Sequence, residues 1–168
     1  MPQKSGLAIG VILFTSAVTA AMSGFAYSAR LDGPEPAPMK PVPFKLAKPD
    51  KPLILVETMV NGKGRYRFVL DTGASLTMIS PELAKKLDVQ RNETQKGVGA
   101  GGSVEVHFGT VKSLAIGETQ LDGLMVEIME LTGISKAIET EIDGIVGYNF
   151  LKKFRVVIDY PRQTVTFD

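Results

Sequence analysis

From Leu53 to the C-terminus, the chain consists of short apolar runs that are separated by turns containing glycine. In Arg65–Leu70, aromatic and aliphatic residues alternate with two arginines, which is the two-residue period of a strand with one buried face. Asn61-Gly62 stands between this run and Leu53–Val60, and this dipeptide favours a tight β-hairpin. The pattern therefore predicts an all-β fold.

Other segments support the same fold class. Further strands are expected at Val104–Phe108, Val111–Ile116, Leu124–Met129, Arg155–Asp159 and Thr164–Phe167. Only Pro81–Leu87 and Asn149–Phe154 favour helices, and the first has Ser80 as a candidate N-cap. A chain of 168 residues is short for two separate cores, so we expect one mostly-β domain with two short helices.

An uncharged apolar segment, Leu7 to Ala29, follows Lys4 near the N-terminus. As a helix it would span roughly 35 Å, enough to cross a bilayer, while Ala26-Tyr27-Ser28 offers the small residues of a signal cleavage site. Residues 1–31 are thus predicted to be a membrane anchor or a cleaved signal. Lys4 favours a cytoplasmic N-terminus, so the domain is expected in the cell envelope, anchored on the periplasmic side or secreted to the periplasm.

Seven prolines lie between Asp32 and Pro52. Such a density resists both helix formation and sheet pairing, because proline lacks the backbone N–H that either structure uses. We therefore expect residues 32–52 to form a semi-rigid linker of polyproline II character. On this basis the folded domain is expected to span residues 53–168.

Composition excludes several classes of function. The net charge of +1 lacks the basic footprint of a nucleic-acid-binding protein, so no nucleic-acid partner is expected. The absence of cysteine excludes disulfides and thiol nucleophiles. His107 is the single histidine and stands on the polar side of its predicted strand, where we expect it to face solvent. Neither a metal nor a cofactor is expected.

The segment with most chemical information is Phe68–Ser75, in which an apolar strand runs directly into Asp71-Thr72-Gly73-Ala74-Ser75. By itself, this motif is weak evidence, because aspartate, threonine and glycine are common turn residues. About 70 residues later, Asp143-Gly-Ile-Val-Gly147 combines an apolar strand end with a glycine. Gly147 would allow the backbone to approach the Asp71 turn closely, or it would simply serve a strand-to-helix turn.

Between these two motifs, Gly97–Gly102 holds four glycines in six residues and precedes an alternating strand. This composition indicates a pliable hairpin tip. A phosphate-binding loop is a weaker interpretation, since no Lys-Ser or Lys-Thr pair follows and no helix begins there.

The order of these motifs resembles that of the retropepsin-like (retroviral-type) aspartic proteases. Their bacterial branch is particularly similar, with Asp-Thr-Gly-Ala, a later Asp-Gly-hydrophobic-hydrophobic-Gly segment and an N-terminal membrane segment. The resemblance covers about Leu53 to Asp168. It implies a single-lobed retropepsin-like acid protease fold, with a closed barrel-like sheet and a flap hairpin at Gly97–Gly102 that closes over bound peptide.

The resemblance also implies roles for individual residues. It assigns catalysis to Asp71, Thr72 and Gly73, with the Thr72 hydroxyl bonded across a two-fold axis and the Gly73 amide close to the carboxylate. The substrate-binding residues that it implies are Ala74, Ser75, Gly99, Ala100, Gly101 and Gly102. The chemistry needs two carboxylates, and the chain has one such motif, so a homodimer acting on peptide or protein substrates is expected.

The expected function is therefore that of an aspartic endopeptidase. An alternative is a catalytically inactive retropepsin-like module for peptide binding or dimerisation, since a fold does not guarantee chemistry. A third is an extracytoplasmic structural β-domain whose glycines serve only turns. Two other carboxylates are noted: Asp143 lies near the proposed site but is expected to have a structural capping role, and Asp159 is expected in a hairpin turn.

Overall fold

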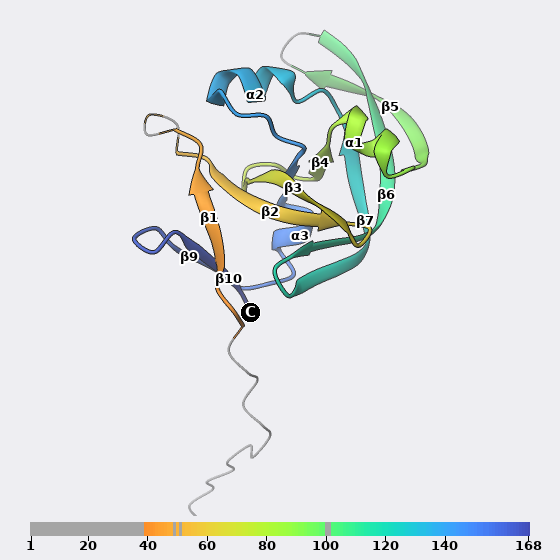
Figure 1. Cartoon of the computed structure of the whole chain (residues 1–168). Helices are drawn as coiled ribbons and strands as arrows, with labels where there is room; N and C mark the ends of the chain where they lie inside the picture. The colour runs from red at the N-terminus through yellow and green to blue at the C-terminus, as the bar shows by residue number, and fades with distance from the viewer. Residues whose placement is uncertain (1–38, 49, 51, 100–101) are drawn as a thin grey trace, which may run out of the picture. The chain divides into compact units, whose positions relative to one another are not determined.

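The computed structural model describes residues 39–48, 50, 52–99 and 102–168, and within them the chain forms ten strands and three short helices (Figure 1). The strands are β1 (Val42–Leu46), β2 (Ile54–Val60), β3 (Lys63–Leu70), β4 (Thr77–Ile79), β5 (Arg91–Gly99), β6 (Gly102–Ile116), β7 (Thr119–Ile128), β8 (Gly144–Val146), β9 (Val156–Asp159) and β10 (Thr164–Phe167). The helices are α1 (Pro81–Lys86), α2 (Thr132–Ile138) and α3 (Tyr148–Leu151). The predicted mostly-β class is confirmed.

The predicted membrane segment, residues 1–31, lies outside the described residues. Among the residues that the structure describes, no helix is long and apolar enough to cross a membrane.

Six of the described strands close into a barrel, in the order β2, β3, β8, β4, β7, β6 and back to β2. The closing contact is the pairing of Met59 with Ala115 and of Val60 with Leu114. β5 extends the sheet beyond β6, and β1, β10 and β9 extend it beyond β2. The expectation of a closed barrel-like sheet is therefore confirmed.

The β2–β3 hairpin turns at Asn61-Gly62, as predicted. Both residues have positive φ, 54° and 67°, which is the conformation of the tight turns that Asn-Gly favours. The Asn61 side chain also makes two hydrogen bonds at this turn. Its Oδ1 accepts the backbone N–H groups of Lys112 (2.7 Å) and Ser113 (3.3 Å). The turn is thereby joined to β6 at the point where the barrel closes.

The β3 strand is buried on both faces near its C-terminal end. Phe68 and Leu70 point into the main core, as the alternation predicted, while Val69 points to the opposite face and is also buried. A second apolar cluster covers that face, with Val69, Ile145 and Ala74 packed together with Ile138 of α2. The end of β3 that leads into Asp71 is therefore held between two apolar layers.

The helix α2 was not predicted. Leu131 at its N-cap makes no side-chain capping bond, and its sequence, Thr-Gly-Ile-Ser-Lys-Ala-Ile, is poor in strong helix formers. Ile138 is buried and Ile134 is partly buried in the second cluster, so tertiary packing stabilises a helix that local propensity does not favour.

The prediction that residues 32–52 form a linker without sheet pairing is wrong for its C-terminal part. β1 lies within that range and pairs with both β10 and β2. Pro43 stands opposite Thr164 of β10, and the backbone bond beside this pair comes from the Phe44 N–H, which donates to the Gln163 carbonyl (2.8 Å). The missing Pro43 N–H is therefore not needed for pairing with β10. The folded part therefore begins before Leu53.

Three smaller differences concern predicted elements. β6 is continuous where two strands were expected, and it forms the predicted glycine-tipped hairpin with β5, a strand for which no residue range was predicted. His107 is partly buried rather than fully exposed. Asp159 does lie at the β9–β10 turn, where the Arg162 backbone N–H and side chain bond to its carboxylate and lower its pKa.

Candidate active site

Asp71 follows β3 directly and is held at the end of the barrel wall. Its backbone N–H donates to the Val146 carbonyl (3.0 Å), which continues the parallel pairing of β3 with β8. Its Oδ1 accepts the Gly73 N–H (2.8 Å), so the Gly73 amide lies close to the carboxylate, as expected. The side chain is partly buried. The turn thus holds the Asp71 carboxylate in one orientation, and the sheet fixes the Asp71 backbone.

The start of α3 anchors the rest of the turn. The backbone N–H of Tyr148 donates to the Ala74 carbonyl (2.7 Å), and that of Asn149 donates to the Ser75 carbonyl (3.2 Å). The first N–H groups of a helix have no partner within the helix, so they are available for such contacts. The first residues of α3, which follow Ile-Val-Gly, therefore hold the Asp71 turn in place through two backbone hydrogen bonds.

Gly147 lies against the same turn, and its lack of a side chain is a steric requirement. A Cβ atom at this position would lie 2.3 Å from the Leu76 carbonyl oxygen and 2.4 Å from its carbon, both backbone atoms. Its φ of −96° is accessible to any residue, so the constraint is close approach and not backbone conformation. The predicted close approach is confirmed.

Two residues that hold the site were missed by the sequence analysis, Thr77 and Asn149. Asn149 Oδ1 accepts both the N–H and the hydroxyl of Thr77, each at 2.8 Å, and its Nδ2 donates to the Met125 carbonyl (2.8 Å). The Thr77 hydroxyl in turn accepts the Gly147 N–H (3.2 Å). One amide side chain therefore joins α3, β4 and β7. The only indication of this role in the sequence was that Asn149, a polar residue, directly follows Ile-Val-Gly-Tyr.

Replacing Asn149 with alanine is expected to destabilise the domain by about 1–3 kcal/mol, because the buried Thr77 hydroxyl and N–H lose their acceptor. Asn149→Asp is the comparison variant: it keeps that acceptor, but its second carboxylate oxygen replaces the donor and faces the Met125 carbonyl, so the loss that it shows reports on the Met125 contact alone. Urea unfolding of the three proteins measures the effect. Equal unfolding midpoints for Asn149→Ala and the parent would show that this network does not hold the turn.

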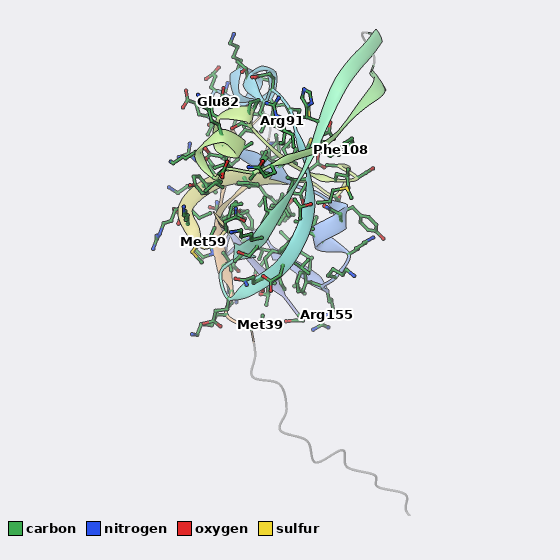
Figure 2. The ribbon with its side chains drawn as sticks, turned by 90° about the vertical axis from the view of Figure 1, so that its right-hand side faces the viewer. Met39, Met59, Glu82, Arg91, Phe108 and Arg155 are labelled. Atoms are coloured by element: carbon green, nitrogen blue, oxygen red, sulfur yellow. The ribbon has the colours of Figure 1, made fainter. Side chains whose placement is uncertain are left out.

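The structure brings five of the predicted site residues into one turn, Asp71 to Ser75. Thr72, Gly73 and Ser75 are exposed, whereas Ala74 is buried in the second apolar cluster. Gly99 and Gly102 form the last pair of the β5–β6 hairpin, and Ala100 and Gly101 lie outside the described residues. Figure 2 shows this hairpin extending beyond the barrel from the level of Arg91 and Phe108.

Other carboxylates occupy different surroundings. Asp143 Oδ2 accepts the Arg67 N–H (2.8 Å), while its own backbone N–H donates to the Arg67 carbonyl (2.8 Å), which is the capping geometry expected for it. Burial raises the pKa of Glu127, which pairs in register with Met78 and Phe108 and is not part of the turn. Among the described residues, no cluster of metal-binding side chains occurs.

The fold is a single-lobed barrel in which an Ile-Val-Gly strand packs against an Asp-Thr-Gly turn. This arrangement is that of the acid-protease folds. The family model described as "Aspartyl protease" matches residues 56–150, and the chain belongs to this family. A crystal structure of a retropepsin-like aspartic protease from Rickettsia conorii is similar in fold, with a TM-score of 0.54 and 19% sequence identity. That match covers 74% of this chain and 88% of the other. No curated protein sequence matches the chain.

Proposed function

We propose that the chain is an aspartic endopeptidase whose catalytic site is completed when two copies bring their Asp71 carboxylates together. The observation that carries this proposal is the Asp71 turn itself. Its carboxylate is oriented by the Gly73 N–H, its backbone is fixed by Val146, and Gly147 packs against the loop. Membership of the aspartyl protease family supports the same chemistry.

The reaction follows from placing two such carboxylates on either side of one water molecule. Two negative charges at short distance repel each other, so the proposed pair of carboxylates shares one proton. The ionised Asp71 removes a proton from water as its oxygen attacks the peptide carbonyl carbon. The protonated Asp71 donates its proton to the carbonyl oxygen. In the collapse of the resulting diol, the Asp71 that took the proton from water gives it to the amide nitrogen, and the other Asp71 takes a proton from a diol hydroxyl. The C–N bond breaks, the amine leaves, and the pair again holds one proton.

One chain supplies one carboxylate, so this mechanism requires a dimer. We infer a two-fold axis between the Asp71 side chains, with an isologous interface. Thr72 is exposed beside Asp71, a position from which its hydroxyl can bond to the partner turn. Ser75 and the flap residues Gly99, Ala100, Gly101 and Gly102 are proposed to bind the backbone of an extended substrate peptide.

Mixing experiments are expected to reveal the shared site. Specific activity on a peptide library should fall as the enzyme is diluted, because dissociated chains have only one carboxylate. Adding an excess of the Asp71→Asn chain to a fixed amount of the parent should also inhibit cleavage, since mixed dimers hold one intact carboxylate. Undiminished activity in a sample that sedimentation shows to be monomeric would rule out the shared site.

We further propose that residues 39–168 lie on the extracytoplasmic side of a membrane. The support is the uncharged run Leu7 to Ala29 behind Lys4. The chain has no cysteine, so a single cysteine introduced at exposed Lys63 gives a clean probe. A membrane-impermeant maleimide is expected to label Lys63→Cys in intact spheroplasts. Labelling only after lysis would place the domain in the cytoplasm instead.

A further inference from the structure

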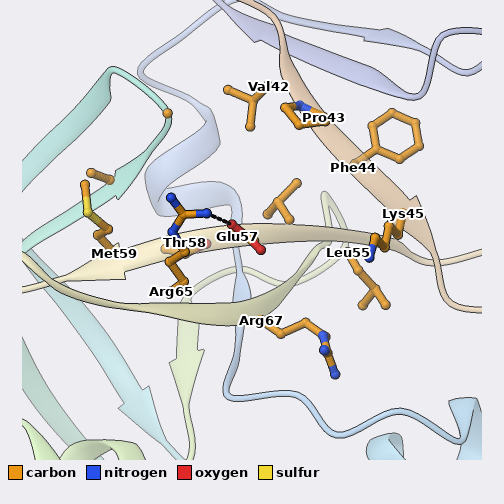
Figure 3. A pocket seen from close by; sticks show the side chains of 13 residues that line it. Val42, Pro43, Phe44, Lys45, Leu55, Glu57, Thr58, Met59, Arg65 and Arg67 are labelled. Atoms are coloured by element: carbon orange, nitrogen blue, oxygen red, sulfur yellow. Dashed lines mark hydrogen bonds and ion pairs between the residues drawn. The ribbon is translucent and has the colours of Figure 1, made fainter.

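β9 is the last strand at one end of the sheet. In the described part of the chain it pairs with β10 alone, whereas β1 has a partner on each side. Figure 3 shows β1, with Val42 and Phe44, running beside Leu55 of β2 at the wall of a cavity. One whole edge of β9 therefore has no strand partner among the described residues.

The backbone groups of Val156 and Ile158 face this open edge. On the other side of the strand, Arg155 exchanges both backbone hydrogen bonds with Asp168, at 2.8 and 3.0 Å. Backbone groups alternate between the two edges of a strand, so Val157, two residues further on, also faces β10. Val156 and Ile158 direct their N–H and carbonyl groups the other way. β9 thus offers a row of hydrogen-bonding groups to another strand.

The side chains of β9 suit contact with a protein surface. Val157 is 47% exposed, although it is a large apolar residue. Val156 and Ile158 pack against the main core and are only partly buried. Proline, lysine and bulges commonly protect an exposed edge strand, and β9 has none of them. A second strand laid along this edge would cover the apolar side chains and satisfy the backbone.

Arg155 and Asp159 place opposite charges at the two ends of β9. Consider a second copy of β9 that runs antiparallel to the first, with the two-fold axis at Val157. Arg155 then lies opposite Asp159 of the second copy, an arrangement of charges that stabilises strand pairs. Val156 forms a hydrogen-bonded pair with Ile158 of the second copy, which matches the direction of their backbone groups.

Neighbouring registers fit less well. An axis at Val156 would place Arg155 opposite Val157, and an axis at Ile158 would place Asp159 opposite Val157. Both registers keep the backbone hydrogen bonds, but both set a charged side chain against an apolar one. The register with Val157 on the axis is the one of these three that satisfies the backbone and the charges together.

The ion pairs within one chain leave room for this contact. Asp168 accepts from Nε and Nη2 of Arg155, and a guanidinium has five N–H donors in all. The Arg155 side chain is also 77% exposed. Asp159 is bound by Arg162 of its own chain. In the paired strands, carboxylates and guanidiniums would alternate in sign across the interface.

We propose that β9 of one copy pairs with β9 of a second copy, antiparallel and with Val157 on the two-fold axis. This inference rests on the proposed function, for which it supplies the contact between the two chains. α3 begins with the Tyr148 N–H bonded to the Ala74 carbonyl in the Asp71 turn (2.7 Å), is about 6 Å long, and leads into β9. One short helix thus joins the Asp71 turn to the β9 edge, so a single two-fold axis can relate both.

Disulfide cross-linking tests the contact in the full chain, which has no cysteine of its own. Opposed residues in a non-hydrogen-bonded pair have Cα atoms about 4.5 Å apart, within the range that a disulfide spans. Val157→Cys is therefore expected to form a disulfide-linked dimer on mild oxidation, with or without Asp71→Asn. Lys63→Cys, exposed in the β2–β3 hairpin, is the matched control and is expected to stay unlinked. Equal linking of the two variants would indicate random collision and overturn the proposal.

Two further cysteines test the register. Arg155→Cys and Asp159→Cys are each expected to stay unlinked when alone, because each would lie about 13 Å along the strands from its own counterpart. Produced together, the two variants are expected to link to each other, since they face each other across the axis. Linking of Arg155→Cys to itself, or no linking in the mixture, would overturn the proposed register. If Asp159→Cys fails to fold, Val157→Cys still decides.

Activity separates this inference from the proposed function. Oxidised Val157→Cys is expected to keep its specific activity on dilution, whereas the parent loses it, because the disulfide holds the two Asp71 carboxylates together. Cross-linking at Val157 in a protein whose parent cleaves no peptide would keep the β9 contact and overturn the proposed function. An active, dimeric parent whose Val157→Cys variant does not link, or is inactive when linked, would overturn the β9 contact alone.

Discussion

Asp71→Asn is expected to fold and dimerise like the parent and to lose peptide cleavage by a factor on the order of 10³ or more. Asparagine keeps the shape of the side chain and can still accept the Gly73 N–H. It cannot hold or release the proton that the water and the peptide carbonyl exchange, and acid–base groups of this kind contribute large rate factors. Cleavage of a peptide library at acid to neutral pH measures the loss.

Asp122→Asn is the matched control, because it makes the same change at an exposed aspartate on β7. It is expected to keep full activity. Continued cleavage by Asp71→Asn would contradict the proposed mechanism. A parent protein that binds peptides without cleaving any would favour the alternative of an inactive binding or dimerisation module.

Gly147→Ala is expected to destabilise the domain by at least about 3 kcal/mol, at the upper end of the usual cost of overpacking. The added methyl would lie 2.3 Å from the Leu76 carbonyl oxygen. That oxygen belongs to the backbone of the loop after Asp71, so the clash cannot be relieved by a side-chain rotation. Domains are stable by only about 5–15 kcal/mol, so the variant loses a large part of its stability. Urea unfolding measures the change.

Gly133→Ala is the control for this substitution. Gly133 lies in α2, where an added Cβ meets no atom within 4 Å. Alanine there is expected to be neutral or to stabilise the domain by up to about 1 kcal/mol, because alanine favours helix over glycine. Equal unfolding midpoints for Gly147→Ala and Gly133→Ala would show that the contact with Leu76 does not constrain the turn.

The features that local sequence predicts well are those with short-range causes. The Asn61-Gly62 hairpin depends on two positive φ angles that these residues adopt at little cost. α1 begins where Ser80 accepts the Leu83 N–H and Pro81 occupies the first helical position. The alternation in β3 places Phe68 and Leu70 in the core. These assignments need no knowledge of distant contacts.

The wrong and missing predictions concern elements that form because of contacts between residues far apart in the sequence. α2 has weak helix propensity and exists because Ile138 packs on the sheet, and β1 forms in a proline-rich segment because β2 and β10 both offer it a partner. Asn149 gave no strong signal, since its role depends on Thr77, 72 residues away in sequence. Propensity is a weak prior that tertiary packing overrides.

By itself, the sequence determined that the chain carries one Asp-Thr-Gly motif after an apolar strand and, about 70 residues later, a glycine after a second apolar strand end. Each of these features lies within a few contiguous residues, so the sequence alone shows which chemical groups it contains. Only the tertiary structure decided how Asp71 is held: by pairing of β3 with β8, by α3 against Ala74 and Ser75, and by Asn149 across three elements. Such contacts join residues far apart in the chain, and closure of the barrel brings them together.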